Sequence, residues 1–217
     1  MSEINIDMVL DKLNKYYLDI CNIENNRYLS WEHCYNAFCY ARKNETVDID
    51  YLCLHLAFYL ASWGMYRGSS FLLQKDYKFH KPIVEEILDS KYDSLVGIPA
   101  KKLVKEENIN LLIEISNKIA GLYECASPGH ENRKNHATDT LITKILLGTL
   151  GCVPAYDRYF VKSLKKYNIA SGTYNKNSMV DICKFYIKYS SDFQKLNIPY
   201  PQMKLVDMCM WQLGIDE

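Results

Sequence analysis

Apolar residues recur along the chain at the three- and four-residue spacing of amphipathic helices. Three such faces are Val9, Leu13, Tyr16 and Ile20, then Leu112, Ile115, Ile119 and Leu122, then Val180, Cys183 and Ile187. No Asn-Gly type of turn stands between two alternating strand patterns. The pattern therefore predicts an all-α fold.

Clusters of Gly, Pro, Ser and Asn divide the chain into about nine or ten helices. These clusters are residues 64–70, 97–100, 127–135, 151–154, 170–177 and 197–201. We expect the last helix to begin near Pro201 and to end at Gly214. Because no repeat or long linker interrupts the pattern, residues 1–217 are expected to form a single compact unit.

The composition is that of an ordinary globular protein, with 48% apolar and 24% charged residues. Residues 1–7 carry acidic side chains and no continuous apolar run follows, so we expect no signal peptide and a cytoplasmic location. The most apolar stretch, residues 51–63, contains His55 and is shorter than the ~20 residues that cross a membrane. We expect it to be a buried helix and the protein to have no membrane partner.

The eight cysteines lack the spacing of a disulfide framework and are expected to be reduced. The nearest approach to a metal-binding pattern is Cys34 and Cys39 beside His33, which is not the usual paired spacing. The sequence therefore predicts no metal and no cofactor.

Charge is balanced over the chain, with 26 basic and 26 acidic residues. Residues 155–195 depart from this balance, because they contain eight basic and three acidic side chains. Such a segment is typical either of a solvated lysine surface or of a local face for nucleic acid. Charge alone does not choose between the two.

The segment 140–166 combines an apolar helix, a terminating Gly151, an extended turn with Pro154 and an acidic residue, Asp157, that opens the next helix. At a helix N-terminus a carboxylate accepts backbone N–H bonds and is favoured in its ionised form. Asp157 is therefore a candidate N-cap, and an ionised carboxylate at that place is also a candidate catalytic group.

In the order Gly151, Pro154, Asp157 and Lys162, this segment resembles the helix-hairpin-helix DNA glycosylases, which include endonuclease III and the adenine and alkylbase glycosylases. The resemblance implies a two-lobed helical bundle with a cleft between the lobes. These would be residues 28–135 and residues 1–27 plus 136–217. It also implies that Asp157 is catalytic and that the partner is duplex DNA with a flipped base.

Three departures from the family refine this expectation. Residues 127–135 stand where the family has its Gly-rich, DNA-gripping hairpin, and the turn from Gly151 to Asp157 is one residue shorter. Thr140 stands where bifunctional members have a Schiff-base lysine, and Lys144 lies one helical turn later, where we expect a surface residue or one that faces phosphate. The resemblance therefore implies a monofunctional glycosylase without lyase activity.

A second segment, residues 61–70, concentrates aromatic, hydroxyl and guanidinium groups in one turn. It is either a helix–helix corner with its aromatic rings in the core or part of a base-binding pocket. The residues expected to surround a base are Trp63, Tyr66, Arg67, Ser69 and Tyr156. Those expected to contact the DNA backbone are Lys144, Arg158, Lys162, Lys165 and Lys166.

The resemblance thus implies a DNA glycosylase that serves base-excision repair or defence against foreign DNA with modified bases. Two alternatives stay open: a non-catalytic helical interaction module of a defence or mobile-element locus, and an inactive nucleic-acid binder on the same scaffold. The glycosylase hypothesis requires Asp157 to face a cleft that it shares with the turn at residues 63–70.

Overall fold

The computed structural model describes residues 4–44, 46–125 and 136–216. Within these residues all regular structure is helical, which confirms the all-α class predicted from the sequence. The elements are α1 (Ile6–Asn22), α2 (Leu29–Ala41), α3 (Ile49–Ser62), η1 (Phe71–Gln74), η2 (Tyr77–His80), α4 (Lys81–Ile87), η3 (Ser90–Leu95), α5 (Ala100–Leu103), α6 (Glu106–Cys125), α7 (Asp139–Thr149), α8 (Arg158–Lys166), α9 (Lys176–Lys188), α10 (Ser190–Lys195) and α11 (Gln202–Ile215), the three η elements being 3-10 helices.

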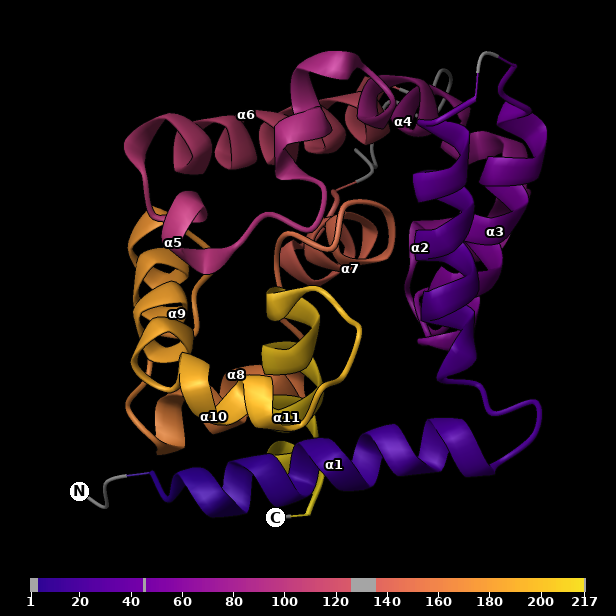
Figure 1. Cartoon of the computed structure of the whole chain (residues 1–217). Coiled ribbons are helices and arrows are strands. Elements are labelled where there is room, and N and C mark those ends of the chain that lie inside the picture. The colour runs from indigo at the N-terminus through magenta and orange to yellow at the C-terminus, as the bar shows by residue number, and fades with distance from the viewer. Residues whose placement is uncertain (1–3, 45, 126–135, 217) are drawn as a thin grey trace.

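The helices surround α7, which occupies the centre of the view in Figure 1. α7 packs against α2, α3 and α6, whereas α11 packs against α1 and α8. α1 and α6 lie at opposite ends of the molecule (Figure 1). Although α7 belongs to the expected terminal lobe, its neighbours come from the other one, so the division into lobes stays an interpretation.

The buried faces of the helices follow the predicted periodicity in most places. In α1 the four buried residues are the four predicted ones, from Val9 to Ile20. In α9 the buried face includes Met179 and Ile182, while Val180 and Ile187 are only partly buried. The predicted face of α9 was therefore displaced by one position.

Two glycines shape α7: Gly148 allows a neighbouring helix to approach closely, and Gly151 ends the helix. A Cβ at Gly148 of α7 would come within 2.5 Å of the Tyr59 ring of α3, so glycine is needed for this close contact of the two helices. Gly151 has a φ of 64° and its N–H donates to the Leu146 carbonyl at 2.9 Å, which ends α7 as predicted.

The expectation that Gly214 ends the last helix is wrong, because α11 continues through Ile215. Gly214 instead lies against α8, where a Cβ would overlap the Tyr159 carbonyl oxygen. The physical reason for glycine here is this close approach of two helices, which places α11 beside the N-terminus of α8.

Candidate functional site

The turn that precedes α8 is held at three points by neighbouring helices. The Ala155 N–H donates to Oδ1 of Asp207 on α11 at 2.9 Å. The Tyr156 N–H donates to the hydroxyl of Thr143 at 2.9 Å, and the hydroxyl of Thr140 donates to the Tyr156 carbonyl at 2.8 Å. Because α7 and α11 both hold this turn, the start of α8 has a fixed position.

Asp157 is the N-cap of α8, which confirms the structural role expected from the sequence. Its Oδ1 accepts the N–H groups of Tyr159 and Phe160, both at 3.1 Å. Its Oδ2 accepts from the Lys144 ammonium at 3.2 Å. The Asp157 carboxylate therefore accepts three hydrogen bonds, one of them from a cation.

These three hydrogen bonds do not occupy all the acceptor positions of the carboxylate. An ionised carboxyl group offers about four acceptor positions, so one of them is left for a water or a ligand. The Asp157 side chain keeps 15% of its surface exposed, and Asp157 lines a pocket. Asp157 is thus a helix cap and a pocket residue at once.

The expected surface position of Lys144 is wrong. Its side chain is only 4% exposed, because α7 is buried on all sides from Leu141 to Thr149. The ammonium lies 5.1 Å from the centroid of the Trp63 ring, in addition to its bond to Asp157. Lys144 is therefore a buried side chain that lines the pocket.

The opposite wall begins where α3 ends. Trp63 is the C-cap of α3, and Gly64 has a φ of 75°, a left-handed conformation that glycine adopts without strain. Trp63 stacks on Tyr28 at 5.5 Å, and Tyr28 stacks on Tyr16 at 4.5 Å. The edge of Trp211 on α11 meets the Trp63 ring at 5.5 Å and 80°. Packed rings thus fix the position of the Trp63 indole.

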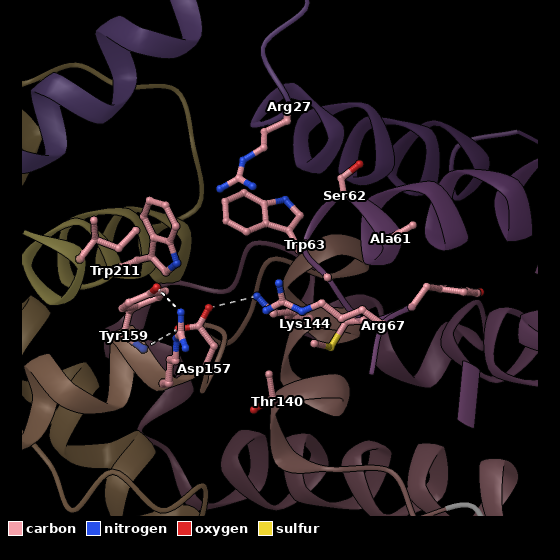
Figure 2. A pocket seen from close by; sticks show the side chains of 15 residues that line it. Arg27, Ala61, Ser62, Trp63, Arg67, Thr140, Lys144, Asp157, Tyr159 and Trp211 are labelled. Carbon is pink, nitrogen blue, oxygen red and sulfur yellow. Dashed lines mark hydrogen bonds and ion pairs between the residues drawn. The ribbon is translucent and has the colours of Figure 1, made fainter. Parts of the chain in front are cut away.

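These walls enclose a pocket of about 640 Å³, which is in the range of ligand-binding sites. Figure 2 shows Asp157 and Lys144 on one side of it and Trp63 and Arg27 on another. The lining residues are Arg27, Ala61, Ser62, Trp63, Gly64, Met65, Tyr66, Arg67, Thr140, Lys144, Asp157, Arg158, Tyr159, Trp211 and Ile215.

The lining is strongly basic for a protein without net charge. It contains four cationic side chains, those of Arg27, Arg67, Lys144 and Arg158, against the single carboxylate of Asp157. Aromatic rings and cations in one concave site are suited to a planar ligand that carries negative charge.

A second lysine–aspartate pair lies beneath the pocket. The Lys204 ammonium donates to Oδ2 of Asp207 at 3.0 Å and lies 5.8 Å from the centroid of the Trp63 ring. The Lys204 side chain is 2% exposed, and burial lowers its pKa despite the neighbouring carboxylate. This pair supports the Ala155 N–H bond and does not line the pocket.

Tyr66, on the pocket wall, is tied to a buried histidine. Its hydroxyl lies 2.6 Å from Nε2 of His80, and Nδ1 of His80 lies 2.7 Å from the Tyr123 hydroxyl. Burial lowers the pKa of His80 to about 4, so the imidazole is neutral near pH 7 and uses one nitrogen as donor and the other as acceptor. The hydrogen bond to His80 therefore fixes the position of the Tyr66 side chain on the pocket wall.

The structure brings most of the residues predicted from the sequence into this one pocket. Those that line it are Asp157, Trp63, Tyr66, Arg67, Lys144 and Arg158. Thr140 lines it as well. Two segments that are far apart in the sequence are thus neighbours.

Five predicted residues do not line the pocket: Ser69, Tyr156, Lys162, Lys165 and Lys166. Tyr156 is buried, and its hydroxyl lies 2.8 Å from Oγ of Ser178, so its ring points into the core and cannot surround a ligand in the pocket. Lys162 donates weakly to the Gly214 carbonyl at 3.5 Å. Ser69 is exposed beyond the turn.

Three pocket residues were missed by the sequence analysis: Arg27, Tyr159 and Trp211. Tyr159 follows Asp157 by two residues and could have been found from the helix register. No local sequence pattern indicates a role for Arg27 or Trp211, because tertiary packing of distant segments brings them to the pocket.

The described residues contain no group of three His, Cys, Asp or Glu side chains that could hold a metal ion. None of the helices in those residues has the length and apolar character needed to cross a membrane. Residues 127–135, which replace the expected hairpin, lie outside the part of the chain that the structure describes.

Fold and site together define an all-α protein with a basic, aromatic pocket at the N-terminus of a helix. The chain matches no protein-family model, no curated protein and no solved structure. The glycosylase resemblance therefore stays a prediction, and the pocket itself must carry the functional argument.

Proposed function

We propose that this protein is a monofunctional DNA glycosylase, which hydrolyses the N-glycosidic bond of a flipped damaged or modified base. The observation that carries the proposal is the pocket shared by Asp157 and the turn from Trp63 to Arg67. These two segments are far apart in the sequence. Asp157 is the predicted catalytic carboxylate, and the turn is the predicted base-binding segment. Their meeting in one concave site is the geometry that this reaction requires.

Asp157 supplies the electrostatic part of the mechanism. Breaking the bond between C1′ and the base nitrogen leaves positive charge on the sugar, which a nearby ionised carboxylate stabilises. Its remaining acceptor position can orient a water toward C1′. The water oxygen bonds to C1′, and the base leaves with the bonding electron pair and takes up the proton that the water releases.

The aromatic wall supplies the binding part. A base that leaves the helical stack loses stacking energy of a few kcal/mol, which an aromatic side chain can replace. Trp63 is suited to this because Tyr28 and Trp211 hold its ring in place. Tyr66 is held by His80 in the same way.

Lys144 is consistent with hydrolysis without a lyase step. In its ion pair with Asp157 the ammonium has no free electron pair with which to attack the sugar. Thr140 lines the pocket at the position of the family's lysine and cannot form a Schiff base. A water is therefore the nucleophile in this proposal.

The test is to incubate the protein with a panel of duplexes, each with one damaged or modified base, and to measure alkali-labile abasic sites. Wild type should produce them with at least one duplex, and Asp157→Asn should lower the rate by about a hundredfold or more. Asp48→Asn is the matched control, because Asp48 caps α3 through its side chain and does not line the pocket.

Folding is controlled by the double variant Asp157→Asn, Lys144→Met, which removes the buried ammonium together with its carboxylate partner. It should unfold as wild type does and stay inactive. No base release from any duplex, or an undiminished rate in Asp157→Asn, would refute the proposal. Trapping of a covalent complex by borohydride would refute its monofunctional part.

A second candidate function is supported by the exposed aromatic face of α2 and α3. Tyr40, Tyr51 and Phe58 are 71%, 52% and 65% exposed, and the first two line a groove with His33 and His55. Such a face is suited to binding another protein. This is the interaction-module alternative, and it does not need the pocket.

A further inference from the structure

Three of the four described arginines lie at the opening of the pocket. Arg27, Arg67 and Arg158 line it and are exposed to solvent. We call them the rim arginines. The fourth, Arg42, is partly buried and pairs with Asp93 and the Ile87 carbonyl. The distribution of arginine is thus strongly biased toward one opening.

The rim arginines come from three separate parts of the chain. Arg27 precedes α2, Arg67 lies in the turn after α3, and Arg158 begins α8. Figure 2 shows Arg27 and Arg67 on different sides of the pocket. Because the fold brings them together from distant segments, their convergence is not a by-product of one polar helix face.

Each rim guanidinium is placed by an uncharged neighbour. Arg27 lies 5.5 Å from the ring centroids of Tyr28 and Trp63, and Arg158 lies 4.4 Å from that of Tyr159. Arg67 packs against Gly64, where a Cβ would come within 2.9 Å of its guanidinium carbon. These contacts orient the groups and leave most of their N–H donors unused.

None of the rim arginines pairs with a carboxylate within the described residues, whereas Lys144, deeper in the same pocket, does. Unpaired, oriented guanidinium groups are suited to tetrahedral oxyanions, which they bind through two parallel N–H bonds. The opening therefore favours phosphate, while the interior favours a planar ring.

We propose that the rim arginines bind the phosphodiester groups on either side of the nucleotide whose base enters the pocket. The ligand is then a polynucleotide strand, not a free base or nucleoside. This inference rests on the proposed function for the identity of the reaction, but it concerns how the strand is held. It assigns the binding of the DNA backbone to the pocket opening. In the glycosylases that the sequence resembles, a Gly-rich hairpin that this sequence lacks binds the backbone.

The test is equilibrium binding of a duplex that contains a tetrahydrofuran abasic site, measured by fluorescence anisotropy between about 50 and 200 mM salt. Each phosphate contact contributes ~0.9 to the slope of log K against log salt concentration. The triple variant Arg27→Gln, Arg67→Gln, Arg158→Gln should therefore lose about 2 to 3 from the slope. Its thermal unfolding should match wild type, because all three side chains are exposed.

The matched control is Lys102→Gln, Lys105→Gln, Lys118→Gln, which removes the same charge from exposed positions outside the pocket. It should leave the slope within about 0.5 of wild type. A second duplex has neutral methylphosphonates on both sides of the abasic site. It should bind wild type at least about tenfold more weakly than the unmodified duplex and should bind the rim variant as the unmodified duplex does.

Equal binding of the two duplexes to wild type, or an equal slope in the rim variant and the lysine control, would overturn the inference. Its failure is distinguishable from failure of the proposed function. Base release with no role for the rim would refute only this inference. Rim-dependent binding of the strand without base release would refute only the glycosylase proposal.

Discussion

Two buried lysine–aspartate pairs lie against the same tryptophan, and they do different things. The ammonium groups of Lys144 and Lys204 lie 5.1 and 5.8 Å from the centroid of the Trp63 ring. Each reaches Oδ2 of its own aspartate, at 3.2 and 3.0 Å. Their chemistry is the same, so the difference must come from their surroundings.

The Lys204–Asp207 pair lies within one turn of α11, and its carboxylate also accepts the Ala155 N–H. This pair stabilises the backbone of the turn before α8. The pair of Lys144 with Asp157 joins α7 to α8 and lines the pocket. The comparison teaches that a buried ion pair by itself does not mark a functional site, whereas an ion pair beside a ligand-sized space is a candidate for one.

The largest predicted effect concerns the pair that does not line the pocket. Lys204→Met should lower the free energy of unfolding by about 3 to 5 kcal/mol, because it leaves the Asp207 carboxylate buried without its cation. Urea unfolding at neutral pH measures this value. Adding Asp207→Asn should recover part of the loss, because an amide oxygen still accepts the Ala155 N–H and carries no charge.

A loss below about 1 kcal/mol in Lys204→Met would contradict the comparison, since it would mean that water reaches Asp207 as readily as it reaches a surface group. No recovery in the double variant would show that Lys204 acts through packing against its aromatic neighbours instead of through its charge.

How far the sequence predicts this site depends on where its residues lie. Gly151 and Asp157 were predicted correctly as helix end and helix cap, because both roles depend on local backbone geometry. The displaced face of α9 shows the limit of periodicity in a helix whose apolar residues are nearly continuous. The overall helical class is the most secure prediction, since it sums over many segments.

The position of Lys144 shows why the rest could not be predicted. α7 is buried on every side, so its sequence has no polar face that would say where a lysine points. Trp211 reaches the pocket on α11, which packs against α1 from the opposite end of the chain, and Arg27 reaches it from the segment between α1 and α2. Such contacts follow from tertiary packing, which no local pattern encodes.

A smaller effect is predicted for the pair that lines the pocket. Lys144→Met should lower the free energy of unfolding by about 1 to 2 kcal/mol, because Asp157 keeps its two backbone N–H bonds and gains access to pocket water. The same urea experiment compares it with Lys204→Met. Equal losses in the two variants would show that the pocket does not hydrate Asp157, and the distinction between the pairs would fail.

The smallest predicted effect is that of Thr140→Val, which we compare with Thr143→Val because the two hydroxyl groups hold the backbone of the same residue, Tyr156. Thr140→Val removes the donor to the Tyr156 carbonyl, whereas Thr143→Val removes the acceptor of the Tyr156 N–H. A carbonyl without a donor is tolerated better than a buried N–H without an acceptor, and Thr140 lines the pocket while Thr143 is fully buried. Thr140→Val should therefore cost less than about 1 kcal/mol and Thr143→Val about 1 to 3 kcal/mol. Thermal unfolding of the two variants side by side measures the difference, and a larger loss in Thr140→Val would show that the turn before Asp157 is held mainly from the pocket side.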